Sequence, residues 1–134
     1  MLKKYELALK ARENAYAPYS KYFVGACLVL KDGSFIIGSN VENSSYGLTN
    51  CAERSALFAA VSQGYKKEDI EEIVIATINE VPGSPCGACR QVIAELMPSD
   101  ALVTLINPKL TNTISLKVKD LLPLAFTGEE LNEK

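Results

Sequence analysis

The 134-residue chain contains no histidine and no tryptophan. The missing histidine is the informative absence, because it excludes the Ser-His-Asp and Cys-His hydrolase arrangements, in which an imidazole moves the proton. Any proton transfer that this protein performs must therefore use a carboxylate, a thiol or a metal-bound water.

The chain also lacks an excess of basic residues and a long apolar run. Fourteen Lys and Arg stand against 16 Asp and Glu, giving a net charge of −2, which disfavours a nucleic-acid-binding surface. No apolar run approaches the roughly 18 residues that span a bilayer, so we expect no membrane association. Three of the four cysteines are bunched in metal-like spacing, as expected in a reducing compartment. These features predict a cytoplasmic protein.

The length fits one domain covering residues 1–134, which is large enough to bury a core without disulfide bonds. Apolar periodicity predicts helices, and short aliphatic runs beside turn residues predict strands. The residues from 128 to 134 form a short acidic tail. Helices that separate strands predict an α/β fold, a three-layer α/β/α sandwich with a mixed five-stranded sheet. The expected helices are 2–16, 51–62, 87–97 and a short one at 119–122, and the expected strands are 22–30, 35–37, 73–78, 101–106 and 113–118.

Three cysteines have the spacing of metal ligands. Cys86 and Cys89 form a Cys-x-x-Cys pair after Pro85, at the start of a predicted helix, and Cys51 starts another predicted helix. Helix N-termini lower thiol pKa values and so favour several thiolates around one cation. Three protein ligands leave the fourth position of zinc open for water, as in catalytic sites. Arg54 and Arg90 follow motif residues and are candidate sources of compensating positive charge.

Glu53 is the candidate proton carrier. It lies two residues after Cys51, near the expected metal without having to bind it. Three thiolates donate strongly and weaken zinc as a Lewis acid, so a bound water needs a base beside it. Glu53 is placed to take a proton from that water and return it to a substrate nitrogen.

The cysteines admit other interpretations. A lone Cys-x-x-Cys is also typical of a redox pair or of half a structural zinc site. Cys27 would complete a four-sulfur structural site, but it lies inside the aliphatic run 24–30, which favours a small core residue. The combination of three cysteines with Glu53 and Pro85 favours a catalytic zinc.

Several stretches together resemble the small homotetrameric cytidine deaminases. Cys-Ala-Glu at 51–53 and Pro-Cys-Gly-Ala-Cys at 85–89 match the three-cysteine form of the zinc-deaminase signature. The resemblance runs from about residue 11 to 131. It implies the cytidine deaminase fold, one zinc ion per subunit, and hydrolytic deamination of cytidine and 2′-deoxycytidine to uridine and 2′-deoxyuridine with release of ammonia, a step of pyrimidine salvage. The other matching stretches are 17–20, 24–26, 40–43 and 121–126.

The resemblance also implies roles for residues outside the metal motif. A zinc-activated water would attack C4 of the cytosine ring, and Glu53 would protonate N3 and then the departing amine. Asn40 and Glu42 would bind the ribose 3′-hydroxyl, because a carboxylate accepts and an amide donates or accepts. A phosphate would crowd Glu42, so free nucleosides are the expected substrates. Arg54 would support the metal ligands from outside.

Four further residues complete the substrate site that the resemblance implies. Tyr22 and Ala52 would contact the base, and Tyr22 departs from the phenylalanine usual in this family. Phe126 resembles a residue that reaches into a neighbouring subunit and stacks on the pyrimidine, and Tyr46 resembles one at the edge shared by two subunits. The resemblance therefore implies composite active sites in a homotetramer.

Three rival functions remain at this point. A deaminase for a modified cytosine nucleoside, of the blasticidin type, shares the chemistry, but Asn40 and Glu42 favour ordinary ribose. An RNA or DNA editing deaminase is disfavoured by the acidic balance of the chain. A structural zinc or redox module without turnover is distinguished by replacing Glu53.

Overall fold

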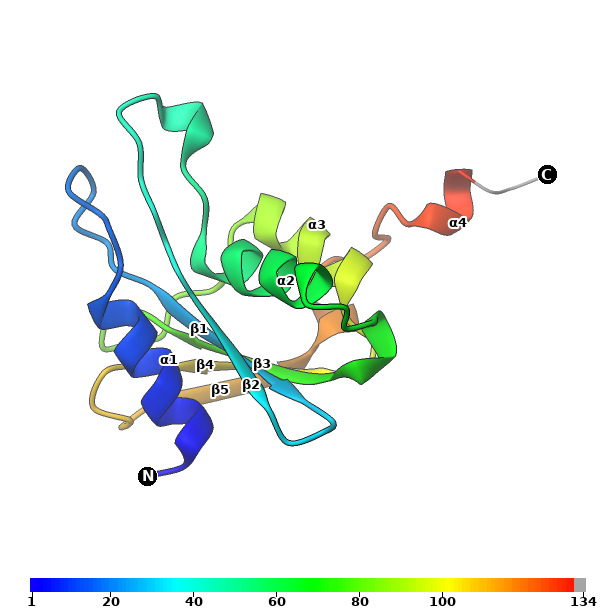
Figure 1. Ribbon diagram of the computed structural model, residues 1–134, viewed down its shortest axis with the longest axis horizontal. Coiled ribbons are helices and arrows are strands. Elements are labelled where there is room, and N and C mark those ends of the chain that lie inside the picture. Colours follow the sequence, from blue (N-terminus) through cyan, green and yellow to red (C-terminus); the bar gives the residue numbers. More distant parts are fainter. Residues whose placement is uncertain (132–134) are drawn as a thin grey trace.

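The computed structural model describes residues 1–131, apart from the side chains of residues 129 and 130, so part of the acidic tail at 128–134 lies outside it. Its five strands form one sheet in the order β2-β1-β3-β4-β5 (Figure 1). The β3 and β4 strands are parallel, and the other neighbours are antiparallel. The predicted mixed five-stranded sheet is therefore confirmed. Its strands are β1 (Gly25–Leu30), β2 (Phe35–Ser39), β3 (Ile70–Ala76), β4 (Leu102–Ile106) and β5 (Thr113–Lys117).

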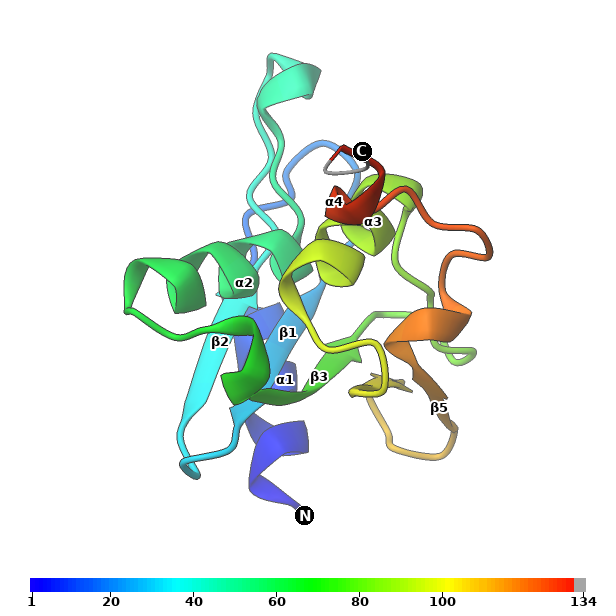
Figure 2. The same cartoon turned by 90° about the vertical axis from the view of Figure 1, so that its right-hand side faces the viewer.

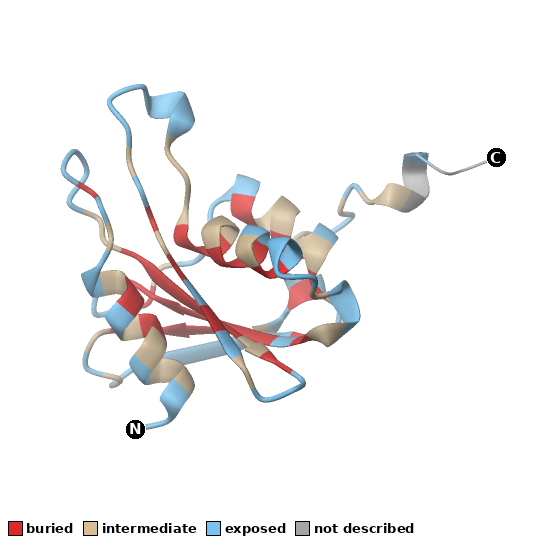
Figure 3. Cartoon of the chain, in the orientation of Figure 1, coloured by how far each residue is buried: buried red, intermediate tan, exposed pale blue. Residues whose placement is uncertain are grey.

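Helices cover both faces of the sheet. The helix α1 (Lys3–Glu13) lies on one face, and α2 (Ala52–Ser62) and α3 (Gly87–Leu96) lie on the other (Figures 1 and 2). Buried residues run along the sheet on both sides (Figure 3). The larger apolar core lies on the α2 and α3 side and a smaller one beneath α1. The predicted three-layer α/β/α sandwich is confirmed.

Two glycines let helices approach the sheet closely. A Cβ atom on Gly25 of β1 would lie 2.1 Å from the Ala8 carbonyl oxygen of α1. A Cβ atom on Gly38 of β2 would lie 2.5 Å from the Ala52 carbonyl oxygen, in the first turn of α2. Only a residue without a side chain permits this approach. The second contact matters for function, because the first turn of α2 carries motif residues.

Two predicted boundaries differ at elements that lead to the site. The helix predicted over 2–16 ends at Glu13. The strand predicted from residue 22 begins at Gly25. In place of strand pairing, the backbone before Gly25 is held by the side chain of Asn40, which accepts from the Val24 N–H at 2.9 Å and donates to the Tyr22 carbonyl at 2.8 Å.

The strand predicted over 73–78 begins earlier, at Ile70, and ends at Ala76. Its first half was obscured by Glu71 and Glu72, since charged residues seldom signal a buried strand. Glu72 is nevertheless buried, and its carboxylate accepts from Lys4 Nζ at 2.7 Å and from Thr104 Oγ1 at 2.6 Å. The ion pair with Lys4 thus allows the charged Glu72 side chain to be buried in the sheet.

The C-terminal region also differs from the prediction. The short helix expected at 119–122 is a 3-10 turn over Val118–Asp120. A short helix, α4 (Gly128–Leu131), was not predicted. It stands away from the rest of the chain (Figure 1). Within the part of the chain described, no helix combines the length and the apolar character needed to cross a membrane.

Candidate metal centre and active site

The three motif cysteines converge on one point. Cys51 is the N-cap residue of α2, and Cys86 is the N-cap residue of α3, with Cys89 in the first turn of α3. Their Sγ atoms all lie within 4.8 Å of one another. Sulfurs around a tetrahedral zinc, at about 2.3 Å from the metal, are about 3.8 Å apart. The group therefore fits one zinc ion after a small contraction.

The electrostatics of this sulfur group also suit a cation. The hydrogen bond from the Cys89 thiol, followed by that from Arg54, lowers the pKa of Cys51 and so favours its thiolate form. The same hydrogen bond, followed by burial, raises the pKa of Cys89, because only one of the two sulfurs can ionise without a metal. A bound metal ion would replace that shared proton, as coordination deprotonates thiols outright. The α2 and α3 N-termini favour the same negative charge.

Arg54 lies beside the sulfur group, as predicted. Its Nη2 donates to Cys51 Sγ at 3.2 Å, and this hydrogen bond raises the pKa of the guanidinium. Its Nε is buried and has no acceptor among the described residues. Three thiolates around Zn²⁺ carry a net charge of −1, so a guanidinium in this position offsets the excess. The structure thus places Arg54 where it would support the donor set from outside.

The other candidate cation and the fourth cysteine have different roles. Arg90 donates from Nε to the Pro85 carbonyl at 2.8 Å and from Nη1 to the Leu121 carbonyl at 2.9 Å. It therefore ties the start of α3 to the C-terminal segment. Cys27 lies in the small core beneath α1, together with Ala8 and Val74. Burial raises its pKa to about 11, and the interpretation of Cys27 as a core residue is confirmed.

Glu53 lies in the first turn of α2 and is only 4% exposed. Burial is the main influence on this carboxyl group and raises its pKa. A raised pKa lets a carboxyl group hold a proton nearer to neutral pH, as a group that both takes and gives protons requires. The charge of Cys51 acts in the same direction. The local sequence thus places a buried carboxyl group with a raised pKa beside the sulfur group.

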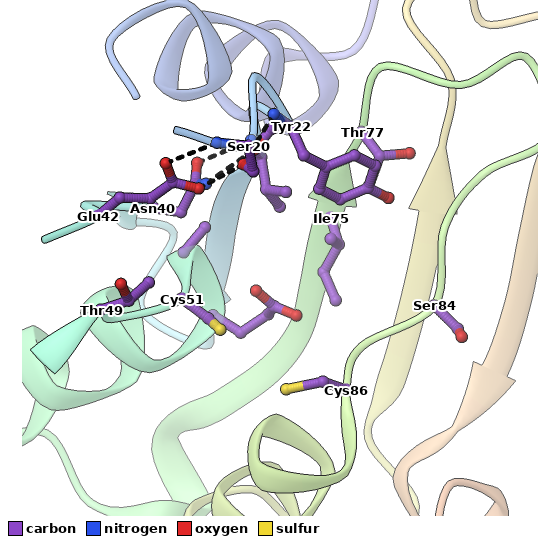
Figure 4. A pocket seen from close by; sticks show the side chains of 13 residues that line it. Ser20, Tyr22, Asn40, Glu42, Thr49, Cys51, Ile75, Thr77, Ser84 and Cys86 are labelled. Carbon is purple, nitrogen blue, oxygen red and sulfur yellow. Dashed lines mark hydrogen bonds between the residues drawn. The ribbon is translucent and has the colours of Figure 1, made fainter. Parts of the chain in front are cut away.

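A pocket of about 310 Å³ opens in front of these residues (Figure 4). Cys51 and Cys86 line one part of it, and Asn40 and Glu42 line another. Such a volume matches a small-molecule site. The structure brings together seven predicted residues in this pocket: Tyr22, Asn40, Glu42, Cys51, Ala52, Glu53 and Cys86.

The sequence analysis assigned no role to Ser20, Thr49, Thr77 or Ser84, which also line the pocket. Ser20 belongs to the stretch 17–20 that supported the resemblance, so a signal existed for it. Thr49 and Thr77 are small polar residues in segments without a motif, and Ser84 directly precedes the motif at 85–89 without being part of it. Their place in the pocket comes from the fold alone.

Asn40 and Glu42 are already engaged in hydrogen bonds. Asn40 is 7% exposed, and its amide pairs with the backbone of Tyr22 and Val24. Glu42 accepts from the backbone N–H groups of Tyr19 and Ser20 and from the Ser20 hydroxyl. The Ser20 hydroxyl is the main cause that lowers the pKa of Glu42, which is therefore an anion at neutral pH.

Two predicted substrate residues do not line this pocket within the subunit. Tyr46 is 79% exposed and lies in the loop between β2 and α2, which projects from the body at the top of Figure 1. Phe126 is 51% exposed and lies just before α4, in the segment at the right of Figure 1. Its carbonyl accepts from Gln91 Nε2 at 2.9 Å. Neither ring therefore lies at this pocket in the described chain.

Residues 2–105 match the family described as the cytidine and deoxycytidylate deaminase zinc-binding region. The chain belongs to the cytidine deaminase family. The matched region includes Cys51, Glu53, Cys86 and Cys89, so the zinc-binding character of the family coincides with the sulfur group of this structure.

Relatives extend the cytidine deaminase likeness over nearly the whole chain. A cytidine deaminase of Halalkalibacterium halodurans is 54% identical over 94% of this chain and 93% of its own length. The crystal structure of cytidine deaminase from Burkholderia pseudomallei has a TM-score of 0.89 at 47% identity, covering 94% of this chain and all of that one. A blasticidin-S deaminase of Bacillus cereus is 34% identical over 81% of this chain and 79% of its own.

Proposed function

We propose that this protein catalyses the hydrolytic deamination of cytidine and 2′-deoxycytidine to uridine and 2′-deoxyuridine, with release of ammonia, as a step of pyrimidine salvage. The chain is a hydrolase of the cytidine deaminase family, and the relatives that bear this name support the substrate class. The observation that carries the proposal is the buried Glu53 carboxyl group beside three converged cysteine sulfurs, in a pocket that Glu42 also lines.

The pocket contains two carboxylates whose pKa values move in opposite directions. Burial raises the pKa of Glu53, and hydrogen bonds led by that of Ser20 lower the pKa of Glu42. Carboxylates separated in this way take different roles, one carrying protons and one remaining an anion. Glu53 is accordingly assigned to proton transfer and Glu42 to the binding of a hydroxyl group.

In the proposed mechanism, Cys51, Cys86 and Cys89 hold one zinc ion per subunit, with Arg54 offsetting their charge. When bound, zinc supplies an activated water to C4 of the cytosine ring. Glu53 takes one proton of that water and delivers it to N3; it then takes the remaining proton from the new hydroxyl on C4 and gives it to the amine, which leaves as ammonia while the C4 carbonyl forms. Because the chain has no histidine, this transfer depends on Glu53.

The substrate is held at both ends of the pocket. Asn40 and Glu42 bind the ribose 3′-hydroxyl, and Ala52 and Tyr22 contact the base. The anionic Glu42 repels a phosphate at that end of the sugar, so free nucleosides are preferred to nucleotides. The same residues favour cytidine over a modified nucleoside of the blasticidin type.

We also propose a homotetramer with composite active sites. The exposed rings of Tyr46 and Phe126 lie in segments that project from the subunit in different directions (Figure 1), which suits contacts with neighbouring copies. Phe126 would then stack on the base held by a neighbour. Replacing Phe126 with Ala is expected to raise the KM for cytidine about tenfold, with the tetramer retained in sedimentation. An unchanged KM in an intact tetramer would count against the composite site.

The residues from 1 to 134 are proposed to act as one catalytic domain in the cytoplasm. The four cysteines are free thiols, which is compatible with a reducing compartment. Fractionation of cells that express the tagged chain tests the location, and recovery in an extracellular fraction would contradict it.

The central test is Glu53→Gln in the zinc-loaded protein. This change removes the proton carrier but keeps the size of the side chain, so cytidine turnover is expected to fall by about 10²–10⁴-fold. Bound zinc, measured by mass spectrometry, is expected to remain at one ion per subunit. Glu68→Gln, a change at an exposed position on the surface, is the matched control. Wild-type protein that holds zinc and turns over neither cytidine nor deoxycytidine would refute the proposal and favour a structural zinc module.

A further inference from the structure

We propose that Ser20 is a positioning residue that holds the Glu42 carboxylate in the orientation required for recognition of the sugar hydroxyl. The inference rests on the proposed function of the pocket. Three donors from one short segment reach the same carboxylate, and Figure 4 shows Ser20 beside Glu42. The N–H groups of Tyr19 and Ser20 donate to Glu42 Oε1 at 3.0 and 3.1 Å, and the Ser20 hydroxyl donates to Oε2.

The direction of the Ser20 hydroxyl is fixed from its other side. Ser20 Oγ accepts from the Tyr22 N–H at 3.0 Å, so its own hydrogen is free to point toward Glu42. The turn that permits this includes Lys21, whose φ of 60° lies in the left-handed region. The Lys21 N–H donates to the Ala17 carbonyl at 3.0 Å and closes the turn. Non-glycine residues adopt this φ at a cost, so the surrounding contacts must impose it.

The result is a short chain of linked hydrogen bonds at the Glu42 side of the pocket. It runs from the Tyr22 backbone, through the Ser20 hydroxyl, to Glu42. Linked hydrogen bonds polarise and strengthen one another. Ser20 and Glu42 both line the main pocket and a neighbouring hollow that also includes Tyr46. With one oxygen held by backbone donors and the other by Ser20, the carboxylate presents its remaining lone pairs in a set direction.

Removal of the Ser20 hydroxyl has a specific expected effect. The two backbone donors on Oε1 remain, but Oε2 loses its donor, and the terminal torsion of a glutamate is broad when nothing fixes it. The charge of Glu42 is kept, and only its orientation is loosened. Since hydrogen bonds to charged groups are strong, we expect Ser20→Ala to raise the KM for cytidine about tenfold. Because the sugar is held equally in the ground and transition states, kcat is expected to stay within about twofold.

The experiment compares cytidine with 3′-deoxycytidine in the zinc-loaded wild type and in three variants. Ser20→Ala removes the hydroxyl, and Ser20→Thr keeps it. Ser99→Ala is the control at an exposed serine outside the pocket. In the wild type, KM is expected to be lower for cytidine than for 3′-deoxycytidine. Ser20→Ala should lose this preference by raising only the KM for cytidine, and Ser20→Thr should retain most of it.

The outcomes separate the inference from the function beneath it. A wild type without cytidine turnover overturns both the proposed function and the role of Ser20. A wild type that treats the two nucleosides alike removes the sugar-binding role of Glu42, and the role of Ser20 with it. A wild type that prefers cytidine, with the same preference in Ser20→Ala, overturns the positioning role alone. An equal rise in KM for both nucleosides also overturns it, because that result indicates a general disturbance of the pocket.

Discussion

Gly38→Ala tests whether the active site depends on the contact between bare strand backbone and α2. The added Cβ would lie 2.5 Å from the Ala52 carbonyl oxygen and 2.6 Å from the Ala56 nitrogen. Ordinary contact begins at 3.4 Å, so the first turn of α2 must withdraw by about 0.9 Å. Both neighbours are backbone atoms, which no change of rotamer can move aside.

The displacement is expected to lower both the stability of the protein and, separately, its catalytic rate. Overpacking against a rigid neighbour costs about 3 kcal/mol, which lowers Tm by about 10 °C for a chain of this size. The turn that moves carries Glu53 and follows Cys51. Because a misplacement of about 1 Å at a reacting centre reduces the rate on the order of 10²-fold, kcat/KM for cytidine is expected to fall by about that factor.

The assay is thermal unfolding together with steady-state deamination of cytidine, at fixed protein and zinc concentrations because binding and assembly both shift Tm. Gly128→Ala is the matched control, since no atom of the described residues lies within 4 Å of a Cβ built there and its φ is ordinary. A Gly38→Ala variant with the Tm and kcat/KM of this control would refute the reasoning. It would show that α2 does not need the bare backbone of β2.

Three further predictions concern charges. Arg54→Ala removes the cation beside Cys51 and is expected to weaken zinc binding by about 10–100-fold in competition with a chromogenic chelator; unchanged affinity would contradict this role. Burial raises the pKa of the Cys27 thiol from 9.0 to about 11, so this thiol ionises at a lower pH in the unfolded chain than in the folded one. As the pH rises from 9 to 11, the free energy of unfolding of the wild type is therefore expected to fall by up to about 3 kcal/mol. In denaturant titrations across this pH range, Cys27→Ala should lose less unfolding free energy than the wild type. Equal losses in the two proteins would refute the raised pKa of Cys27. Lys4→Met removes the cation that pairs with the buried Glu72 and is expected to lower the free energy of unfolding by about 2 kcal/mol, less than for a fully buried pair because Lys4 is partly exposed. Adding Glu72→Gln should restore most of this stability. A double variant as unstable as Lys4→Met would count against the ion pair.

The metal motif could be identified from the sequence because the geometry of its residues is mostly set within short segments. Cys86 and Cys89 are separated by one helical turn, and Glu53 follows Cys51 by two residues, so each short segment sets its own arrangement. Only the meeting of the two segments is tertiary. The alternation of helices and strands likewise predicted the layers and the number of strands, since apolar periodicity reflects burial.

The errors arose where a distant partner changed the local preference. Glu72 made the first half of β3 look exposed, yet Lys4, 68 residues away, pairs with it. The backbone before Gly25 looked like strand, yet the Asn40 amide holds it in place of a neighbouring strand. No window of sequence contains such partners, so periodicity cannot report them.

The amino-acid sequence alone was sufficient to predict the three-cysteine group and the α/β class and to nominate Glu53 as the proton carrier, because these predictions follow from residue type and short spacing. The tertiary structure decided which polar groups share the pocket, and it separated the two carboxylates into a buried one and a hydrogen-bonded one. It also revealed Ser20 as a partner of Glu42. Burial and long-range hydrogen bonds set the pKa values and orientations of side chains, and both exist only once the chain has folded.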